Sequence, residues 1–257
     1  MGNRASQNFL GAWWAPMLIE KSPPRFRERL ALRVLSLSPH YFFDSEGRLW
    51  MPASLVRKEA IRNSSSRAQI VDEVIRPYVG PADTVVDYGC GAGYMASHVA
   101  RLAKRVIGCD VSDGALTCAR VLNNANNIDY IHPRGLADQH DIADLVYSFA
   151  MAQHVTNKVL SEILHSIHRI LRPGGTLLMH FVVNGKGWKT ESEAVHDKSV
   201  RGRIRLKYGL NCFSRSSDQV LGLAQAAGFI DPKILRMAQI TRVDDDVARQ
   251  HLLSCHI

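Results

Sequence analysis

The sequence has few cysteines, no long apolar run and no internal repeat. Its five cysteines in 257 residues are an odd number, and no two form a C-x-x-C pair. This scarcity argues against a disulfide framework or a zinc knuckle and favours a reducing, cytoplasmic compartment. No stretch reaches the roughly 18 apolar residues that a membrane span needs. The apolar patch at 9–19 lacks a small-residue cleavage site, so we expect no signal peptide.

The composition is that of a folded globular protein, and its charge is unevenly distributed. Hydrophobic residues make up 46% and charged residues 22%, which excludes disordered, collagen-like and coiled-coil chains. The net charge is +8. Residues 1–63 hold ten Lys and Arg against five Asp and Glu, and residues 185–215 hold eight against three. These two basic segments favour an acidic partner, although solvated surfaces explain them equally well.

Strand-like and helix-like segments alternate from about residue 68 onward. This alternation predicts an α/β fold, with a doubly wound, mostly parallel, seven-stranded sheet covered on both faces. The last two strand segments are joined by Asp244-Asp245-Asp246, which leaves no room for a crossover helix and implies an antiparallel C-terminal edge strand. The predicted strands are 84–87, 105–110, 128–132, 144–148, 176–183, 233–240 and 249–256, and the predicted helices are 68–78, 94–103, 113–123, 158–171 and 217–227.

A glycine-rich turn follows the first predicted strand, at Val85-Val86-Asp87-Tyr88-Gly89-Cys90-Gly91-Ala92-Gly93. Glycines between a strand and a helix let the backbone approach a ligand where a Cβ would clash. The dinucleotide fingerprint G-x-G-x-x-G would place glycine at position 94, which is tyrosine here. Asp87 precedes the first glycine by two residues, and its carboxylate suits a ligand with an ammonium group better than one with a pyrophosphate.

Four further elements follow in a recognisable order. They lie at 106–112, at 143–155, at 171–176 (LRPGGT) and at 226–229 (AAGF). Together with the glycine-rich turn, they resemble the motifs of class I S-adenosylmethionine-dependent methyltransferases, whose first motif is two hydrophobic residues followed by D-x-G-x-G-x-G. The resemblance covers about residues 66–257. It implies a transferase with a Rossmann-like fold and S-adenosylmethionine as its cofactor.

The resemblance also implies how the cofactor is held. Asp87 would contact the methionine part, and Asp110 would accept hydrogen bonds from both ribose hydroxyls. The acidic residue that the family often has after its third strand is missing, so backbone groups near Gly135 and Leu136 would hold the adenine, with Asp138 as the alternative. Cys90 is interpreted as a small filler in the loop. The complete set of predicted cofactor residues is Arg67, Asp87, Gly89, Cys90, Gly91, Asp110, Val111, Gly135, Leu136, Ser148 and Phe149.

Two residues have competing interpretations. Arg67 reaches the cofactor carboxylate or, alternatively, helps the cluster at 63–66 to cap the helix that follows. His154 follows the fourth strand, whose carboxyl end borders the methyl group in this fold. Its imidazole is the candidate catalytic base for a substrate hydroxyl, and a packing role is the alternative. His165 and His168 share a helix face, but no third ligand is nearby, so no metal site is predicted.

Two segments are expected to shape the acceptor site. Residues 1–63 are predicted to form an N-terminal helical cap, and residues 64–257 the methyltransferase domain, with a substrate-side insertion at 185–215. The cap contains a basic amphipathic segment at 25–36, preceded by Trp13 and Trp14. We favour a lid over the active site, and peripheral contact with an anionic membrane is the alternative.

These features predict O-methylation of a small or medium-sized acceptor. The acceptor classes are a glycan, a lipid-linked compound, a quinone precursor or a secondary metabolite, and the basic segments suit an acidic one. An RNA methyltransferase is the first alternative. It is less favoured because Ser148-Phe149-Ala150-Met151 stands where an Asn-Pro-Pro-Tyr-type motif would be, and nucleic acid is therefore not the expected partner. The second alternative is a protein that binds the cofactor without turnover, which the intact cofactor motifs disfavour.

Overall fold

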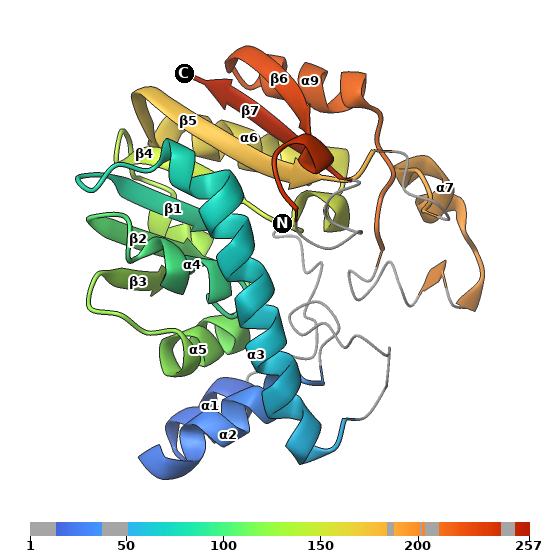
Figure 1. Cartoon of the computed structure of the whole chain (residues 1–257). Coiled ribbons are helices and arrows are strands. Elements are labelled where there is room, and N and C mark those ends of the chain that lie inside the picture. The colour runs from blue at the N-terminus through green and yellow to red at the C-terminus, as the bar shows by residue number, and fades with distance from the viewer. Residues whose placement is uncertain (1–13, 38–50, 184–187, 201, 204–210, 243–249) are drawn as a thin grey trace.

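The structure is a computed structural model that describes residues 14–37, 51–183, 188–200, 202–203, 211–242 and 250–257. Seven strands form one sheet in the order β3-β2-β1-β4-β5-β7-β6 (Figure 1). The strands are β1 Thr84–Tyr88, β2 Arg105–Cys109, β3 Ile128–Ile131, β4 Ala143–Ser148, β5 Leu171–Phe181, β6 Ile230–Arg236 and β7 His251–His256.

The sheet is mostly parallel, and β7 alone among the described strands runs in the opposite direction. Strands β1 to β5 pair in parallel, whereas β7 is antiparallel to both β5 and β6. The predicted fold class is therefore confirmed, including the antiparallel C-terminal strand. Within the last pair, β7 lies against β5 and β6 takes the outer position.

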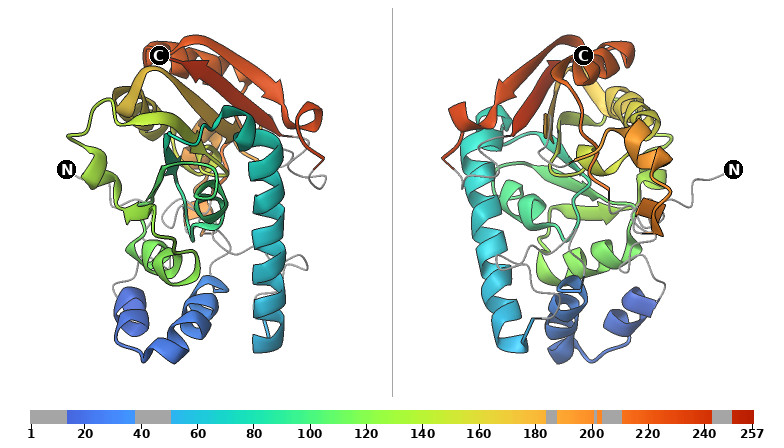
Figure 2. Two further views of the ribbon diagram at one scale, coloured as in Figure 1. Left: turned by 60° about the vertical axis from the view of Figure 1, so that its left-hand side comes forward. Right: turned by 90° about the vertical axis from the view of Figure 1, so that its right-hand side faces the viewer.

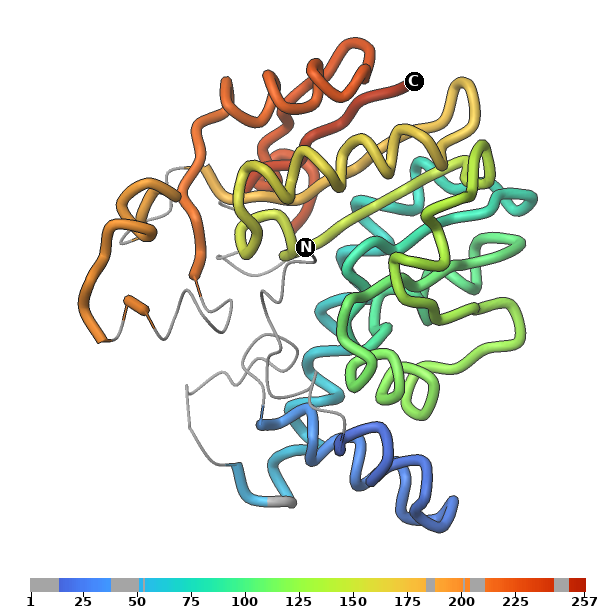
Figure 3. Tube along the Cα trace, turned by 180° about the vertical axis from the view of Figure 1, so that it is seen from behind, coloured from blue at the N-terminus to red at the C-terminus, as the bar shows by residue number. Residues whose placement is uncertain are grey.

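Helices cover both faces of the sheet, because side chains along each strand alternate between two apolar clusters. Val86 packs in the cluster that contains α6 (Asn157–Ile170) and α9 (Ser217–Ala226), which lie in front of the sheet in Figure 3. Val85 packs in the opposite cluster with α4 (Tyr94–Val99) and part of α5 (Asp113–Leu122). This arrangement is the doubly wound one, and it leaves the carboxyl ends of β1, β2 and β4 adjacent to one another.

Within the segment predicted to form a cap, the structure has two helices, α1 (Trp14–Glu20) and α2 (Pro24–Leu35). Both lie beside α5 at the end of the molecule opposite β6 and β7 (Figure 2). Ile19 and Leu35 are fully buried in a third apolar cluster, which also contains Cys118 of α5 and Ala92 of the glycine-rich turn. The apolar face of the cap thus packs on the domain. Trp13, at the start of this segment, lies outside the described residues.

The helix before β1 begins earlier than expected. Helix α3 runs from Ala53 to Ile70 and continues into a π-helical turn, Val71–Ile75. The prediction that 63–66 caps a new helix is wrong, because these residues lie within α3. Val56 and Ala60 bury their side chains against the cap, and this packing stabilises the helix through the serines, whose own helix propensity is modest. The proposed division at residue 63 therefore falls inside one helix.

The insertion contributes a short helix and two isolated β-bridges to the described part of the chain. Helix α7 spans Glu191–His196, and Phe213 and Arg215 pair with Lys189 and Val183, respectively. The basic residues Arg201, Arg205 and Lys207 of this segment lie outside the described residues. Among the described helices, none is both long enough and apolar enough to cross a membrane.

Candidate active site

The glycine-rich turn connects β1 to α4 in a conformation that L-residues rarely adopt. Gly89, Gly91 and Gly93 have φ angles of +85°, +53° and +76°. A Cβ on Gly93 would lie 2.3 Å from the Tyr130 hydroxyl oxygen, and one on Gly89 would lie 3.0 Å from Met151. Two of the glycines are thus required by close packing as well as by the backbone angle.

Asp110 holds this turn in place from the end of β2. Its Oδ2 accepts a hydrogen bond from the Gly91 amide at 2.9 Å, and its Oδ1 accepts one from the Ser112 amide at 2.9 Å. Ser112 in turn caps α5 through its hydroxyl. The carboxylate is nearly buried, at 6% exposure. The structure thereby brings together the two motifs that sequence reasoning assigned to one ligand.

Asp87 lies at the base of the turn with an unsatisfied oxygen. Its side chain is 3% exposed, and Oδ2 has no hydrogen-bond partner. Burial raises the pKa of this carboxyl from 3.8 to about 7, and the nearby Asp110 raises it further, whereas the Tyr147 hydroxyl opposes the shift. A buried acceptor without a donor is costly, and a ligand ammonium group would satisfy it.

A partly buried cation, Arg67, lies near the residue that follows the turn. Burial lowers the pKa of Arg67, which has no hydrogen bond or ion pair with the described residues. Tyr94, the residue after the last glycine, is close enough to interact with it electrostatically, and its hydroxyl is also buried without a partner. A partly buried guanidinium without a hydrogen-bond partner among the described residues favours an anionic ligand. Asp87 and Arg67 thus offer opposite charges, one suited to an ammonium group and the other to a carboxylate.

The side that would receive an adenine ring is less enclosed. Val111 follows Asp110 and is 60% exposed, which leaves its apolar surface available for packing. Residues Pro133–Leu136 form a 3-10 turn after β3. The Leu136 side chain is buried in the core, so this turn offers a ligand its backbone and Gly135. Asp138, the alternative residue, is exposed.

The segment after β4 packs on the glycine-rich turn. Ser148 is fully buried, and the ring of Phe149 stacks on His180 of β5 with centroids 5.1 Å apart. Ala150 has a φ of +56° and donates its amide hydrogen to His180 Nδ1 at 3.2 Å. Burial lowers the pKa of His180 to about 4, so the ring is neutral at pH 7 and carries its proton on Nε2.

His154 lies in the 3-10 turn Ala152–His154 that follows this segment. Its amide donates to the carbonyl of Met151, the residue that touches Gly89. Its Nδ1 lies 3.1 Å from the Asn211 carbonyl oxygen and 3.7 Å from the Cys212 sulfur. Because a carbonyl can only accept, Nδ1 carries the proton, and the lone pair of the neutral ring is on Nε2. This is the tautomer that a base acting through Nε2 requires.

The surroundings of Cys90 and His168 indicate packing roles for both residues. Burial raises the pKa of Cys90 well above its usual value, and its sulfur lies beside Gly108 of β2, as expected for a filler. Within the described residues, no group of three His, Cys, Asp or Glu side chains could hold a metal ion. His168 instead packs edge-on against Phe229.

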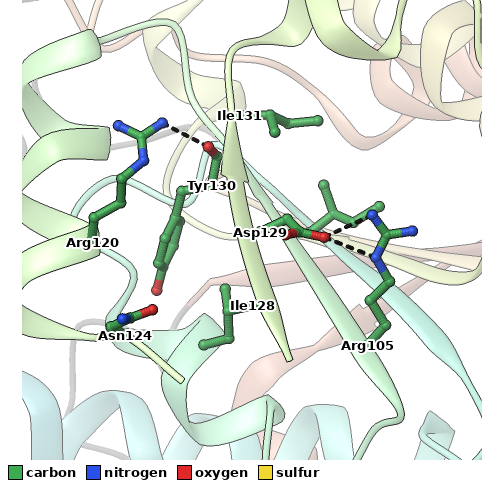
Figure 4. Close-up of a pocket in the computed structure, with 8 residues that line it drawn as sticks. Arg105, Arg120, Asn124, Ile128, Asp129, Tyr130 and Ile131 are labelled. Carbon is green, nitrogen blue, oxygen red and sulfur yellow. Dashed lines mark hydrogen bonds and ion pairs between the residues drawn. The ribbon is translucent and has the colours of Figure 1, made fainter. Parts of the chain in front are cut away.

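A separate hollow of about 480 Å³ lies beside the outer strand β3 (Figure 4). In it, Arg120 donates to the Tyr130 carbonyl oxygen, and Arg105 pairs with Asp129. Its lining residues come from β2, β3 and the end of α5 and include none of the predicted site residues. The site at the carboxyl ends of the strands is therefore the candidate active site, as expected for an open α/β sheet.

Sequence reasoning did not identify several residues that complete this site. Met151, His180 and Tyr94 are single residues in otherwise ordinary segments, and their roles depend on contacts between distant elements. Asn211 acts through its backbone carbonyl, which leaves no side-chain signal. Tyr94 was noted only as the residue that breaks the dinucleotide fingerprint.

Comparison with known families shows which kind of domain this sheet and turn belong to. A family model described as a methyltransferase domain matches residues 86–179, from β1 into β5. The chain carries a class I S-adenosylmethionine-dependent methyltransferase domain. The predicted family and cofactor are thereby confirmed.

Relatives of this methyltransferase domain differ in how much of the chain they match. The ubiquinone biosynthesis O-methyltransferase of Ruegeria pomeroyi is 33% identical over 104 residues, which is 39% of this chain and 40% of the relative. A chain from the complex of the Haloferax volcanii Trm112 methyltransferase activator aligns with a TM-score of 0.57 at 19% identity, covering 78% of this chain and 93% of that one. The S-adenosylmethionine-dependent methyltransferase of Mesorhizobium loti aligns with a TM-score of 0.52 at 19% identity, covering 74% and 98%. The solved structures share the fold, and this chain spans less than half of the Ruegeria relative.

Proposed function

We propose that this methyltransferase domain transfers the methyl group of S-adenosylmethionine to a hydroxyl group of an aromatic quinone precursor. The observation that carries the proposal is the 3.1 Å contact between His154 Nδ1 and the Asn211 carbonyl oxygen, which favours the Nδ1–H tautomer in a turn that contacts the glycine-rich turn. The name of the Ruegeria relative supports an oxygen acceptor and, within the classes predicted from the sequence, favours a quinone precursor.

The residues around the turn would divide the cofactor between them. Asp87 and Arg67 would hold the ammonium and carboxylate of the methionine part, and Asp110 the ribose hydroxyls, while Val111, Gly135 and Leu136 would border the adenine. When bound, S-adenosylmethionine supplies an activated methyl group. The buried, pre-formed turn fixes the direction from which an acceptor must approach.

His154 would remove the hydroxyl proton of the acceptor through Nε2. Proton removal makes the oxygen a stronger nucleophile, and a correctly placed base contributes about 100- to 10,000-fold to such reactions. The imidazolium that forms keeps its Nδ1–H bond to the Asn211 carbonyl, which stabilises the added charge. Neither the removal of the hydroxyl proton nor the transfer of the methyl group requires a metal ligand from the protein.

The test uses S-adenosylmethionine with a radiolabelled methyl group and a panel of catechol, a prenylated catechol, a methyl glycoside and total RNA. We expect label on a catechol oxygen, and His154→Ala should lower that rate about 100-fold or more while cofactor affinity stays within about threefold. His165→Ala is the matched control, since this exposed histidine of α6 bonds only to its own helix at Ser161. Label on RNA or the glycoside alone, or an unchanged rate in His154→Ala, would overturn the proposal.

A further inference from the structure

Arg215 is a buried arginine whose hydrogen bonds all go to one short segment. Its side chain is 4% exposed. Nη1 donates to the Ala152 carbonyl at 2.7 Å, Nη2 donates to the Val155 carbonyl, and Nε donates to Asn157 Oδ1 at 2.7 Å. The guanidinium therefore holds three acceptors between β4 and α6, and His154 lies between them.

Hydrogen bonds to backbone carbonyls stabilise the buried guanidinium of Arg215, which has no salt bridge with the described residues. Burial lowers the pKa of Arg215, an effect that nearby Glu191 partly opposes, yet no carboxylate in the described residues forms an ion pair with it. Ala152 and Val155 lie in and just after a 3-10 turn, outside the regular helix that begins at Asn157. Their carbonyls would otherwise be buried without regular partners, and a planar fork of donors satisfies both at once.

The same stretch of chain also sets the proton position on His154. Asn211, four residues before Arg215, accepts the Nδ1–H bond through its carbonyl. The Phe213 amide donates to the Gln153 carbonyl at 2.7 Å, and the Asn157 amide donates to Glu191 Oε2 at 2.6 Å. Residues 211–215 thus contact the His154 turn on both sides of the histidine.

We propose that Arg215 is the positioning residue for His154, and that the end of the insertion sets the tautomer of this base by holding its turn against Asn211. The inference rests on the proposed function, in which His154 is the base. It adds that His154 can accept a proton through Nε2 only when residues 211–215 contact its turn. Arg215 acts through the backbone of the turn and does not itself contact the acceptor.

The test is nitrogen-15 NMR of histidine-labelled protein, with the His154 signals assigned by their loss in His154→Gln. The wild type is expected to show His154 as the Nδ1–H tautomer. Arg215→Met keeps an unbranched side chain of intermediate length but removes all three hydrogen bonds, and a mixture of tautomers is expected. Arg105→Met, at an exposed ion pair between β2 and β3, is the matched control and should leave the His154 signals unchanged.

Measurements of methylation rate distinguish a failure of this inference from a failure of the proposed function. Arg215→Met should lower the rate of catechol methylation on the order of 10- to 100-fold and move the midpoint of its pH profile, with cofactor affinity within about threefold. If Arg215→Met does not fold, Asn157→Ala, which removes one of the three acceptors, provides the same comparison. An unchanged His154 tautomer in folded Arg215→Met, or in Asn157→Ala where Arg215→Met does not fold, would overturn the inference. Altered tautomers together with no methylation of any catechol would leave the positioning role standing and refute the proposed function alone.

Discussion

The Asp87 carboxyl should make both stability and cofactor affinity depend on pH near neutrality. Its pKa is raised by burial from 3.8 to about 7 in the folded protein without ligand. The folded state therefore keeps this proton over a pH range in which the unfolded chain has lost it. Stability from this group is complete below pH 3.8 and is lost progressively as the pH rises toward 7. The full shift corresponds to about 4 kcal/mol.

Asp87→Asn removes the titration and keeps the shape of the side chain. We expect the variant without ligand to be more stable than the wild type at pH 8. The difference should grow by about 3 kcal/mol between pH 5 and pH 8, since about two units of the shift lie in that interval. For a domain of this size, each kcal/mol moves Tm by roughly 2–4 °C. Thermal unfolding at both pH values measures this, with Asp113→Asn at the exposed start of α5 as the control.

Cofactor binding should respond in the opposite direction. The ammonium group needs the ionised carboxylate, so wild-type affinity for S-adenosylmethionine should rise up to about tenfold per pH unit between pH 5 and pH 7. Asp87→Asn should bind weakly at every pH and show no such slope by calorimetric titration. The reasoning is refuted if the variant is less stable than the wild type at pH 8, or if the wild-type affinity is independent of pH in this interval.

Three further predictions concern packing, hydrogen bonding and thiol reactivity. Both Gly93→Ala and Gly174→Ala place a Cβ at positive φ, but only the former meets another group, the Tyr130 hydroxyl oxygen at 2.3 Å. Gly93→Ala should therefore destabilise by about 2 kcal/mol more in chemical denaturation; equal losses would contradict this. Asp144→Ala should lower the unfolding free energy by about 1–3 kcal/mol, because it removes the acceptor of the first amide of β1. Arg172→Ala removes its partly exposed ion pair and an exposed hydrogen bond to the Asp141 carbonyl, and it should cost less than about 1 kcal/mol. Iodoacetamide followed by peptide mass spectrometry should find Cys212 modified before the buried thiols, and faster modification of any buried thiol would count against the packing described.

Short-range patterns explain why much of the fold could be predicted. Residues 84–86 are β-branched, and glycines that tolerate positive φ begin at residue 89, so the strand and the turn are specified by neighbouring residues. The alternation of such units with amphipathic helices then restricts the sheet to a parallel, doubly wound form. The end of α3 shows the limit of this reasoning. Ser64, Ser65 and Ser66 suit a helix start, but burial of Val56 and Ala60 against the cap extends the helix through them.

The candidate site likewise has one part that the sequence predicts and another that depends on tertiary contacts. The sequence alone determined the cofactor turn and Asp110, because the carboxylate and the amides it holds lie in motifs with fixed spacing at the ends of two adjacent strands. Tertiary structure decided the tautomer of His154 and the surroundings of Arg215. Their partners are about 60 residues apart in the chain and include backbone carbonyls, which every residue possesses and no sequence pattern marks. Only folding brings those carbonyls to one imidazole and one guanidinium.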